Sequence, residues 1–145
     1  MKPARTLVYC LLLVNGACAK GQSATTATPI HLPQKTTTMI TASLKHPVVK
    51  QAIDALQAGD LKAWNALFSK GASLWDDGRK IDLGHFSQEA LGHERFTAID
   101  KVAREGLDIY GRFHSDRWGD FKTYFKFYID DAGKIEKLEI GQASY

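Results

Sequence analysis

The segment from Phe121 to Ile129 alternates between apolar and polar side chains, and this alternation constrains the fold more than any other feature of the sequence. In an extended strand, successive side chains point to opposite faces. One face needs an apolar layer packed against it, while the other tolerates water, so we predict a sheet that is covered on one side. The covered face would carry Phe121, Thr123, Phe125, Phe127 and Ile129, and the other face Lys122, Tyr124, Lys126 and Tyr128.

Turns rich in glycine and aspartate separate this strand from other segments of extended character. Asp77-Gly78 is a two-residue hairpin signal. Gly106 follows the expected strand 95–104, and Gly119 lies near the turn that follows the expected strand 107–115. Because short turns join neighbouring strands, we expect antiparallel pairing in a sheet of four to five strands. Residues 86–91 are expected to form a short helix or an irregular segment. The other segments expected to be extended are 72–76, 79–83, 95–104, 107–115 and 134–141.

Two helices are expected before these strands. Pro47 suits the first turn of a helix and Gly59 its end, and the apolar residues between them recur at a spacing of three and four. Asp60 is placed to cap a second, shorter helix whose inward side would carry Trp64 and Phe68. Packing between the two helices would explain these two aromatic residues without any ligand.

The first 19 residues have the pattern of a secretory signal peptide. Lys2 and Arg5 precede the apolar run Leu7–Val14, and Ala17-Cys18-Ala19 supplies the small-x-small pattern at which signal peptidase cleaves. The run is far shorter than the ~20 residues of a membrane-spanning helix. We therefore expect export to the periplasm or to the outside of the cell, with residues 1–19 removed.

Cys18 permits a second interpretation, a lipoprotein anchored at that residue. Gly16-Ala17-Cys18 matches the end of a lipobox, although Asn15 stands where such motifs usually have Leu or Val. Residues 20–43 are rich in Thr, Ala and Ser and carry little apolar surface, so we expect a flexible linker there. A long linker would suit a lipoprotein. The folded part is then one domain over residues 44–145.

Removal of the leader changes the composition of the protein. It takes away both cysteines, so the mature domain would hold no disulfide. It also takes Lys2 and Arg5 from the 19 Lys+Arg, which leaves 17 against 16 Asp+Glu. A nearly neutral domain gives no electrostatic basis for binding nucleic acid. The sequence has no phosphate-binding glycine loop and no nucleotide fingerprint, so we expect no cofactor.

The sequence combines this order of two helices, a hairpin and long strands with several short stretches that are similar to those of a known superfamily. These stretches are Ala55-Leu56-Gln57-Ala58-Gly59-Asp60-Leu61, Leu67-Phe68, Trp75-Asp76 and residues 130–138. They resemble the nuclear transport factor 2-like superfamily, which includes ketosteroid isomerases and SnoaL-like polyketide cyclases, and the resemblance covers nearly all of the folded part. It implies an α+β fold in which a curved antiparallel sheet wraps around two or three N-terminal helices and encloses a cone-shaped pocket. Small apolar ligands and dimers are common in this superfamily.

The comparison with the isomerases extends to single residues when Gly59-Asp60 and Gly133 are used as anchors. Asp76 then falls at the position of their general base, while Ala52 and Phe125 fall where they keep the two groups that donate hydrogen bonds to the oxyanion. Without those donors, this chain is a poor candidate for steroid isomerisation. Asp76 remains a candidate base, because apolar neighbours would raise its pKa. The alternative is that Asp76 is a polar residue of the hairpin turn.

Three histidines invite a metal or an acid–base interpretation. His85, Glu89 and His93 are spaced by four residues, but Gly84 and Gly92 make a continuous helix doubtful, so we expect no metal site. His114 belongs to the face opposite Phe113 and is expected outside the pocket.

The sequence thus predicts an exported domain that binds a small, largely apolar molecule, with weak acid–base chemistry at Asp76 as a further role. The expected ligand contacts are Trp64, Phe68, Trp75, Phe125 and Phe127. The alternative is a non-catalytic dimerisation or protein-interaction module of the cell envelope that uses the outer face of the sheet. That face, through which we also expect a homodimer, would present Tyr110, Arg112, Tyr124, Lys126 and Tyr128.

Overall fold

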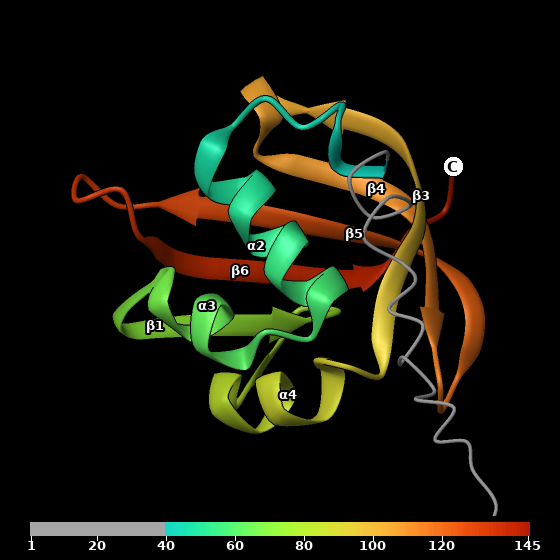
Figure 1. The fold of residues 1–145 in the computed structure, drawn as a ribbon, viewed down its shortest axis with the longest axis horizontal. Coiled ribbons are helices and arrows are strands. Elements are labelled where there is room, and N and C mark those ends of the chain that lie inside the picture. The colour runs from blue at the N-terminus through green and yellow to red at the C-terminus, as the bar shows by residue number, and fades with distance from the viewer. Residues whose placement is uncertain (1–39) are drawn as a thin grey trace, which may run out of the picture. The chain divides into compact units, whose positions relative to one another are not determined.

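A computed structural model describes residues 40–145 (Figure 1). The expected signal peptide and most of the expected linker lie outside the described residues. Ile40 packs against the core and Thr41 is fully buried, where its hydroxyl donates a hydrogen bond of 2.7 Å to Asp54. Packed structure is therefore present four residues before Leu44.

From residue 43 onward, three helices precede or interrupt the strands, and each begins or ends at a residue suited to that position. Pro47 lies in the first turn of the first helix, and Gly59 ends it with a left-handed φ of 66°. A Cβ atom at Gly59 would also lie 3.2 Å from the backbone of Gly92, so both the left-handed φ and this close approach favour glycine there. Asp60 caps the next helix by accepting a hydrogen bond from the Ala63 N–H. The helices are α2 (Pro47–Ala58), α3 (Leu61–Ala66) and α4 (Leu83–Ala90).

In the part of the chain that the structure describes, six strands form one curved sheet, and α2 lies across one of its faces (Figure 1). Their order in the sheet is β2-β1-β6-β5-β4-β3, and a short 3-10 turn over Arg104–Gly106 joins β3 to β4. All neighbours pair antiparallel except β1 and β6, which pair in parallel. The strands are β1 (Phe68–Asp76), β2 (Arg79–Ile81), β3 (Glu94–Ala103), β4 (Asp108–Ser115), β5 (Gly119–Ile129) and β6 (Ile135–Gln142).

The predicted α+β class, a curved sheet over N-terminal helices, is confirmed, and two details of the prediction are corrected. The sheet has six strands rather than four to five, and it is mixed rather than wholly antiparallel. The parallel pair joins strands that are distant in sequence, which reasoning from short turns does not address. Phe68 begins β1 instead of ending the second helix, because α3 stops at Ala66.

The core is an aromatic layer on the face of the sheet that α2 covers. Thr123, Phe125 and Phe127 of β5 are buried and alternate with partly exposed residues, as the sequence predicts. Phe125 packs edge-on to Phe96 of β3 at 5.1 Å between ring centroids, and Phe113 of β4 lies 5.6 Å from Phe125. This row of rings connects three neighbouring strands beneath the helices.

A buried hydrogen bond connects α3 to α4. The side chain of Trp64 is fully buried, and its indole N–H donates to the Ser87 hydroxyl at 2.9 Å. That hydroxyl in turn donates to the Leu83 carbonyl at 2.6 Å. A buried indole N–H without a partner is costly, so Ser87 allows Trp64 to fill the space between the helices.

Within residues 40–145, none of the helices combines the length and the apolar character that crossing a membrane requires.

Ser87→Ala should lower the free energy of unfolding by about 1–3 kcal/mol, because it leaves the buried Trp64 N–H without an acceptor. Urea denaturation followed by tryptophan fluorescence measures this change. Ser43→Ala, at an exposed position, is the matched control and should change the stability little. Equal stabilities of the Ser87 and Ser43 variants would show that the hydrogen bond contributes nothing.

Candidate binding site

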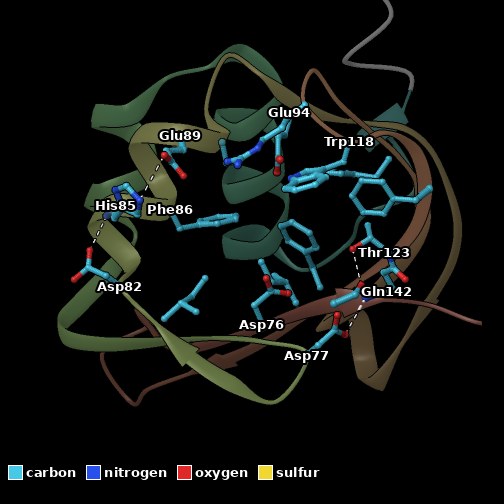
Figure 2. A pocket seen from close by; sticks show the side chains of 18 residues that line it. Asp76, Asp77, Asp82, His85, Phe86, Glu89, Glu94, Trp118, Thr123 and Gln142 are labelled. Atoms are coloured by element: carbon cyan, nitrogen blue, oxygen red, sulfur yellow. Dashed lines mark hydrogen bonds and ion pairs between the residues drawn. The ribbon is translucent and has the colours of Figure 1, made fainter. Parts of the chain in front are cut away.

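A cavity of about 590 Å³ opens beside the aromatic core. It lies where the β1–β2 turn, α4, the β4–β5 turn and the end of β6 come together (Figure 2). Its volume is in the usual range for small-molecule sites. The residues that line it are Asp76, Asp77, Ile81, Asp82, His85, Phe86, Glu89, Ala90, Glu94, Phe113, Arg117, Trp118, Phe121, Thr123, Phe125, Ile140, Gly141 and Gln142.

One part of the cavity wall is a continuation of the aromatic core. Phe113, Phe121 and Phe125 all line it, and the ring of Phe113 lies 5.7 Å from that of Phe121. Phe86 of α4 adds a ring from another side. Trp118, in the β4–β5 turn, is 68% exposed although it lines the cavity, so its indole lies at the mouth (Figure 2). This part of the cavity therefore offers an aromatic surface to a ligand.

The polar part of the wall is predominantly acidic. Five of the lining residues are carboxylates, and among the lining residues of the described chain Arg117 is the one arginine or lysine. The guanidinium of Arg117 lies 4.7 Å from the centroid of the Trp118 ring. The carboxylates are Asp76, Asp77, Asp82, Glu89 and Glu94.

Three of these carboxylates have partners that hold them. The Asp77 carboxylate accepts from the Gln142 N–H at 3.1 Å, and Asp82 caps α4 by accepting from the His85 N–H at 2.6 Å. Glu89 lies 3.5 Å from the His85 imidazole. These contacts are those of turn and helix-end residues, so the three carboxylates have structural roles as well as a place at the cavity.

Asp76 and Glu94 differ from the other three. Asp76 is the last residue of β1 and has the same parity as the buried Leu74, so it lies on the cavity side of the strand. Within residues 40–145, no group donates a hydrogen bond to its carboxylate. Glu94 begins β3 opposite Ser115, whose side chain hydrogen-bonds to it. Figure 2 shows the two acids on opposite sides of the cavity, with Phe86 and Trp118 flanking them.

The surroundings disfavour the ionised form of both acids. Partial burial, followed by repulsion from Asp77, raises the pKa of Asp76 above its ordinary value. Burial also raises the pKa of Glu94, and the Asp76, Asp116 and Glu89 carboxylates raise it further, while the Ser115 hydrogen bond opposes the change. The Asp76 carboxylate thus acts on Glu94 across the cavity.

Solved structures with this architecture include a carotenoid-binding protein. The Orange Carotenoid Protein of Anabaena (Nostoc) sp. PCC 7120, in a structure binding canthaxanthin, matches 70% of this chain at 17% sequence identity and a TM-score of 0.57. This chain spans 36% of that protein's length.

Two smaller proteins match over most of their own length. An NTF2-like protein of unknown function from Cytophaga hutchinsonii matches at 12% identity and a TM-score of 0.54, covering 66% of this chain and 87% of that one. The chain has the NTF2-like fold. A candidate ketosteroid isomerase from Kribbella flavida matches at 13% identity and a TM-score of 0.55, over 69% of this chain and 78% of that one. No protein-family model and no curated protein matches the sequence.

The NTF2-like fold brings two of the predicted site residues to the cavity and places four elsewhere. Asp76 and Phe125 line it. Trp64 and Phe127 are fully buried in the core instead, and Phe68 packs against Trp64 at 5.1 Å. Trp75 alternates with Asp76 along β1 and therefore lies on the outer face, where its ring is 5.5 Å from the Lys137 ammonium. Trp64, Phe68, Trp75 and Phe127 therefore do not line this cavity, and their role as ligand contacts stays a prediction.

Other lining residues were not predicted from the sequence. The sequence pattern could have indicated Phe113 and Phe121, because Phe121 shares the inward face of β5 with Phe125, and Phe113 of β4 pairs with Phe121. No sequence pattern indicates Glu94, Phe86 or Trp118, since their approach to the cavity depends on how α4 and the β4–β5 turn fold over the sheet.

Two of the histidines of this NTF2-like fold share a carboxylate, since both His93 and His114, the latter at 3.6 Å, lie near Asp116. His85 pairs with Glu89 on α4, whereas His93 lies 3.1 Å from Asp116. His114 lies 2.6 Å from Asp120 and does not line the cavity. Within residues 40–145, no three side chains of metal-ligating type are grouped closely enough to hold an ion.

Asp76→Asn should raise the melting temperature at about pH 7, because the folded state disfavours the ionised carboxylate that the substitution removes. The pKa of Asp76 is higher in the folded protein than the unfolded value of 3.8, so the destabilisation is present above the folded pKa and disappears as pH falls below 3.8. The gain should therefore vanish at about pH 3. Calorimetry at both pH values measures it.

Asp131→Asn removes the same charge from an exposed turn away from the cavity and serves as the control for this prediction. A lower melting temperature for Asp76→Asn at neutral pH would mean that the carboxylate makes a net favourable contact in the folded protein.

Proposed function

We propose that this protein binds a small, largely apolar molecule in the cavity between α4 and the sheet. The observation that carries the proposal is the aromatic wall, in which Phe86, Phe113, Phe121 and Phe125 border an open volume of about 590 Å³. Packed cores leave few voids larger than a water molecule, so a volume of this size is typical of a ligand site. Burial of apolar ligand surface against these rings would supply the affinity.

The fold gives this proposal indirect support. The Orange Carotenoid Protein, one of the structures that the chain resembles, is described with canthaxanthin bound. We propose binding of an apolar molecule for this chain as well, on the basis of its own cavity.

Asp76 remains our candidate for acid–base chemistry at the site. Its raised pKa and its position on the cavity side of β1 suit a base. Phe125, by contrast, presents an apolar ring to the cavity at the position where the isomerases keep a hydrogen-bond donor. Weak acid–base chemistry on a bound ligand is therefore a subordinate part of the proposal.

The outer face of the sheet favours a second proposal, a homodimer or a protein-interaction surface. Tyr110 and Tyr124 are directly paired across β4 and β5, and their rings lie 6.4 Å apart. The Lys101 ammonium lies 5.3 Å from the Tyr110 ring and the Lys126 ammonium 4.8 Å from the Tyr124 ring. Aromatic rings of this kind are enriched at protein interfaces.

Export is part of the proposal and rests on residues 1–19 of the sequence alone. We propose a periplasmic or secreted protein, with a lipoprotein anchored at Cys18 as the alternative.

The neutral fluorophore N-phenylnaphthylamine should bind to the mature protein with a rise in its fluorescence, because the aromatic cavity shields it from water. Thr123→Phe, which places a ring at the cavity wall, should weaken this binding by at least about tenfold. Thr97→Phe makes the same substitution at an exposed position outside the cavity and should leave the affinity unchanged. Absence of binding, or equal binding to both variants, would contradict the proposed site.

Tyr110→Glu should convert a dimer to a monomer if the outer face is the subunit interface, because it buries a charge between two copies. Sedimentation equilibrium measures the mass of both forms. A monomeric unsubstituted protein, or a variant that remains dimeric, would refute the interface.

A further inference from the structure

The charge of the cavity wall restricts the kind of apolar molecule that it can hold. The five carboxylates come from β1, the β1–β2 turn, α4 and the start of β3, so they border the cavity from several sides. Arg117 does not neutralise them: its guanidinium lies over the Trp118 ring, and within the described residues it forms no ion pair with a lining carboxylate. An anionic ligand would therefore meet repulsion on entering.

Asp76 and Glu94 are the two lining carboxylates that are not held by contacts of a turn or a helix end. Asp76 receives no hydrogen bond within residues 40–145, and Glu94 receives one, from Ser115. The two carboxylates line the same cavity, and the charge of Asp76 raises the pKa of Glu94 there. A positive charge placed between them would relieve this repulsion and supply both with a counter-ion.

The aromatic wall is also suited to a cation. Ammonium groups bind to the faces of aromatic rings, and carboxylates combined with such rings are a recurrent means of recognising amines and quaternary ammonium groups. A contact of this kind is present at the mouth of the cavity, where the Arg117 guanidinium lies 4.7 Å from the centroid of the Trp118 ring. The remaining rings, Phe86, Phe113 and Phe121, offer apolar surface for the body of the ligand.

We propose that the cavity selects organic cations, in which an amine or quaternary ammonium group is carried on a compact apolar body. Asp76 and Glu94 bind the charged group, and the phenylalanine rings and Trp118 pack against the rest. This inference rests on the proposed function, because it names the class of ligand for the same cavity.

A series of probes that differ in charge tests the selection. Hexyltrimethylammonium, heptanol and heptanoate have apolar chains of similar length and a positive, neutral and negative head group. Each displaces N-phenylnaphthylamine from the mature protein at about pH 7, and its affinity follows from that displacement. We expect the cation to bind about tenfold or more tightly than the alcohol, and the anion to bind most weakly.

Two nearly isosteric substitutions test the two acids. Asp76→Asn and Glu94→Gln should each reduce the affinity for hexyltrimethylammonium by about threefold to tenfold and leave the affinity for heptanol unchanged. Asp131→Asn and Glu136→Gln, which remove the same charges at exposed positions outside the cavity, should change neither affinity. If a variant fails to fold, the affinities of the three probes for the unsubstituted protein still test whether the cavity selects cations.

The possible results separate this inference from the proposed function. Equal or tighter binding of heptanol or heptanoate would overturn the selection of cations while leaving an apolar site intact. A loss of cation affinity that is the same in the control variants would assign the effect to net charge and would also overturn it. If N-phenylnaphthylamine and all three probes fail to bind, the proposed function itself is wrong.

Discussion

The contact among the phenylalanine rings of β3, β4 and β5 is the interaction on which the rest of this structure depends. Phe96, Phe113, Phe125 and Phe127 hold the helices against the sheet, with ring centroids 5.0 to 6.4 Å apart. The same row continues through Phe113 to Phe121 and becomes the wall of the cavity. Because core and site share these rings, the wall is fixed by the packing that stabilises the fold, and a ligand would meet a surface that is already in place.

The cavity combines this fixed apolar wall with acids that the fold does not favour in their ionised form. Raised pKa values for Asp76 and Glu94 mean that folding brings these carboxylates into surroundings less suitable than water. Stability alone would not select such residues, since amides of the same shape would avoid the repulsion. Groups that cost stability are common at binding and catalytic sites, and this gives the two acids greater weight than the three whose contacts are those of turns and helix ends.

Most of the fold could be predicted from the sequence, whereas only part of the site could. Pro47, Gly59, Asp60 and the Asp77-Gly78 turn are local signals, and the alternation over 121–129 fixed which face of β5 is buried. The parallel pairing of β1 with β6 is not local, and the sequence contains no turn that indicates it.

The lining of the cavity was only partly predictable for a related reason. Trp64, Phe68 and Phe127 are aromatic and inward-facing like Phe125, and composition does not distinguish a ring that fills the core from one that borders a cavity. Glu94 has no pattern around it, and it reaches the cavity only because β3 begins next to the β4–β5 turn.

The position of β6 has a consequence for the order in which the sheet can assemble. This strand lies between β1 and β5, and it pairs Ile140 with Asp76 and with Phe125. Until residues 135–142 join the sheet, the β1–β2 hairpin has no strand to pair with and β5 has an unpaired edge. A partly folded chain therefore carries an open template for pairing with other chains until β6 is in place.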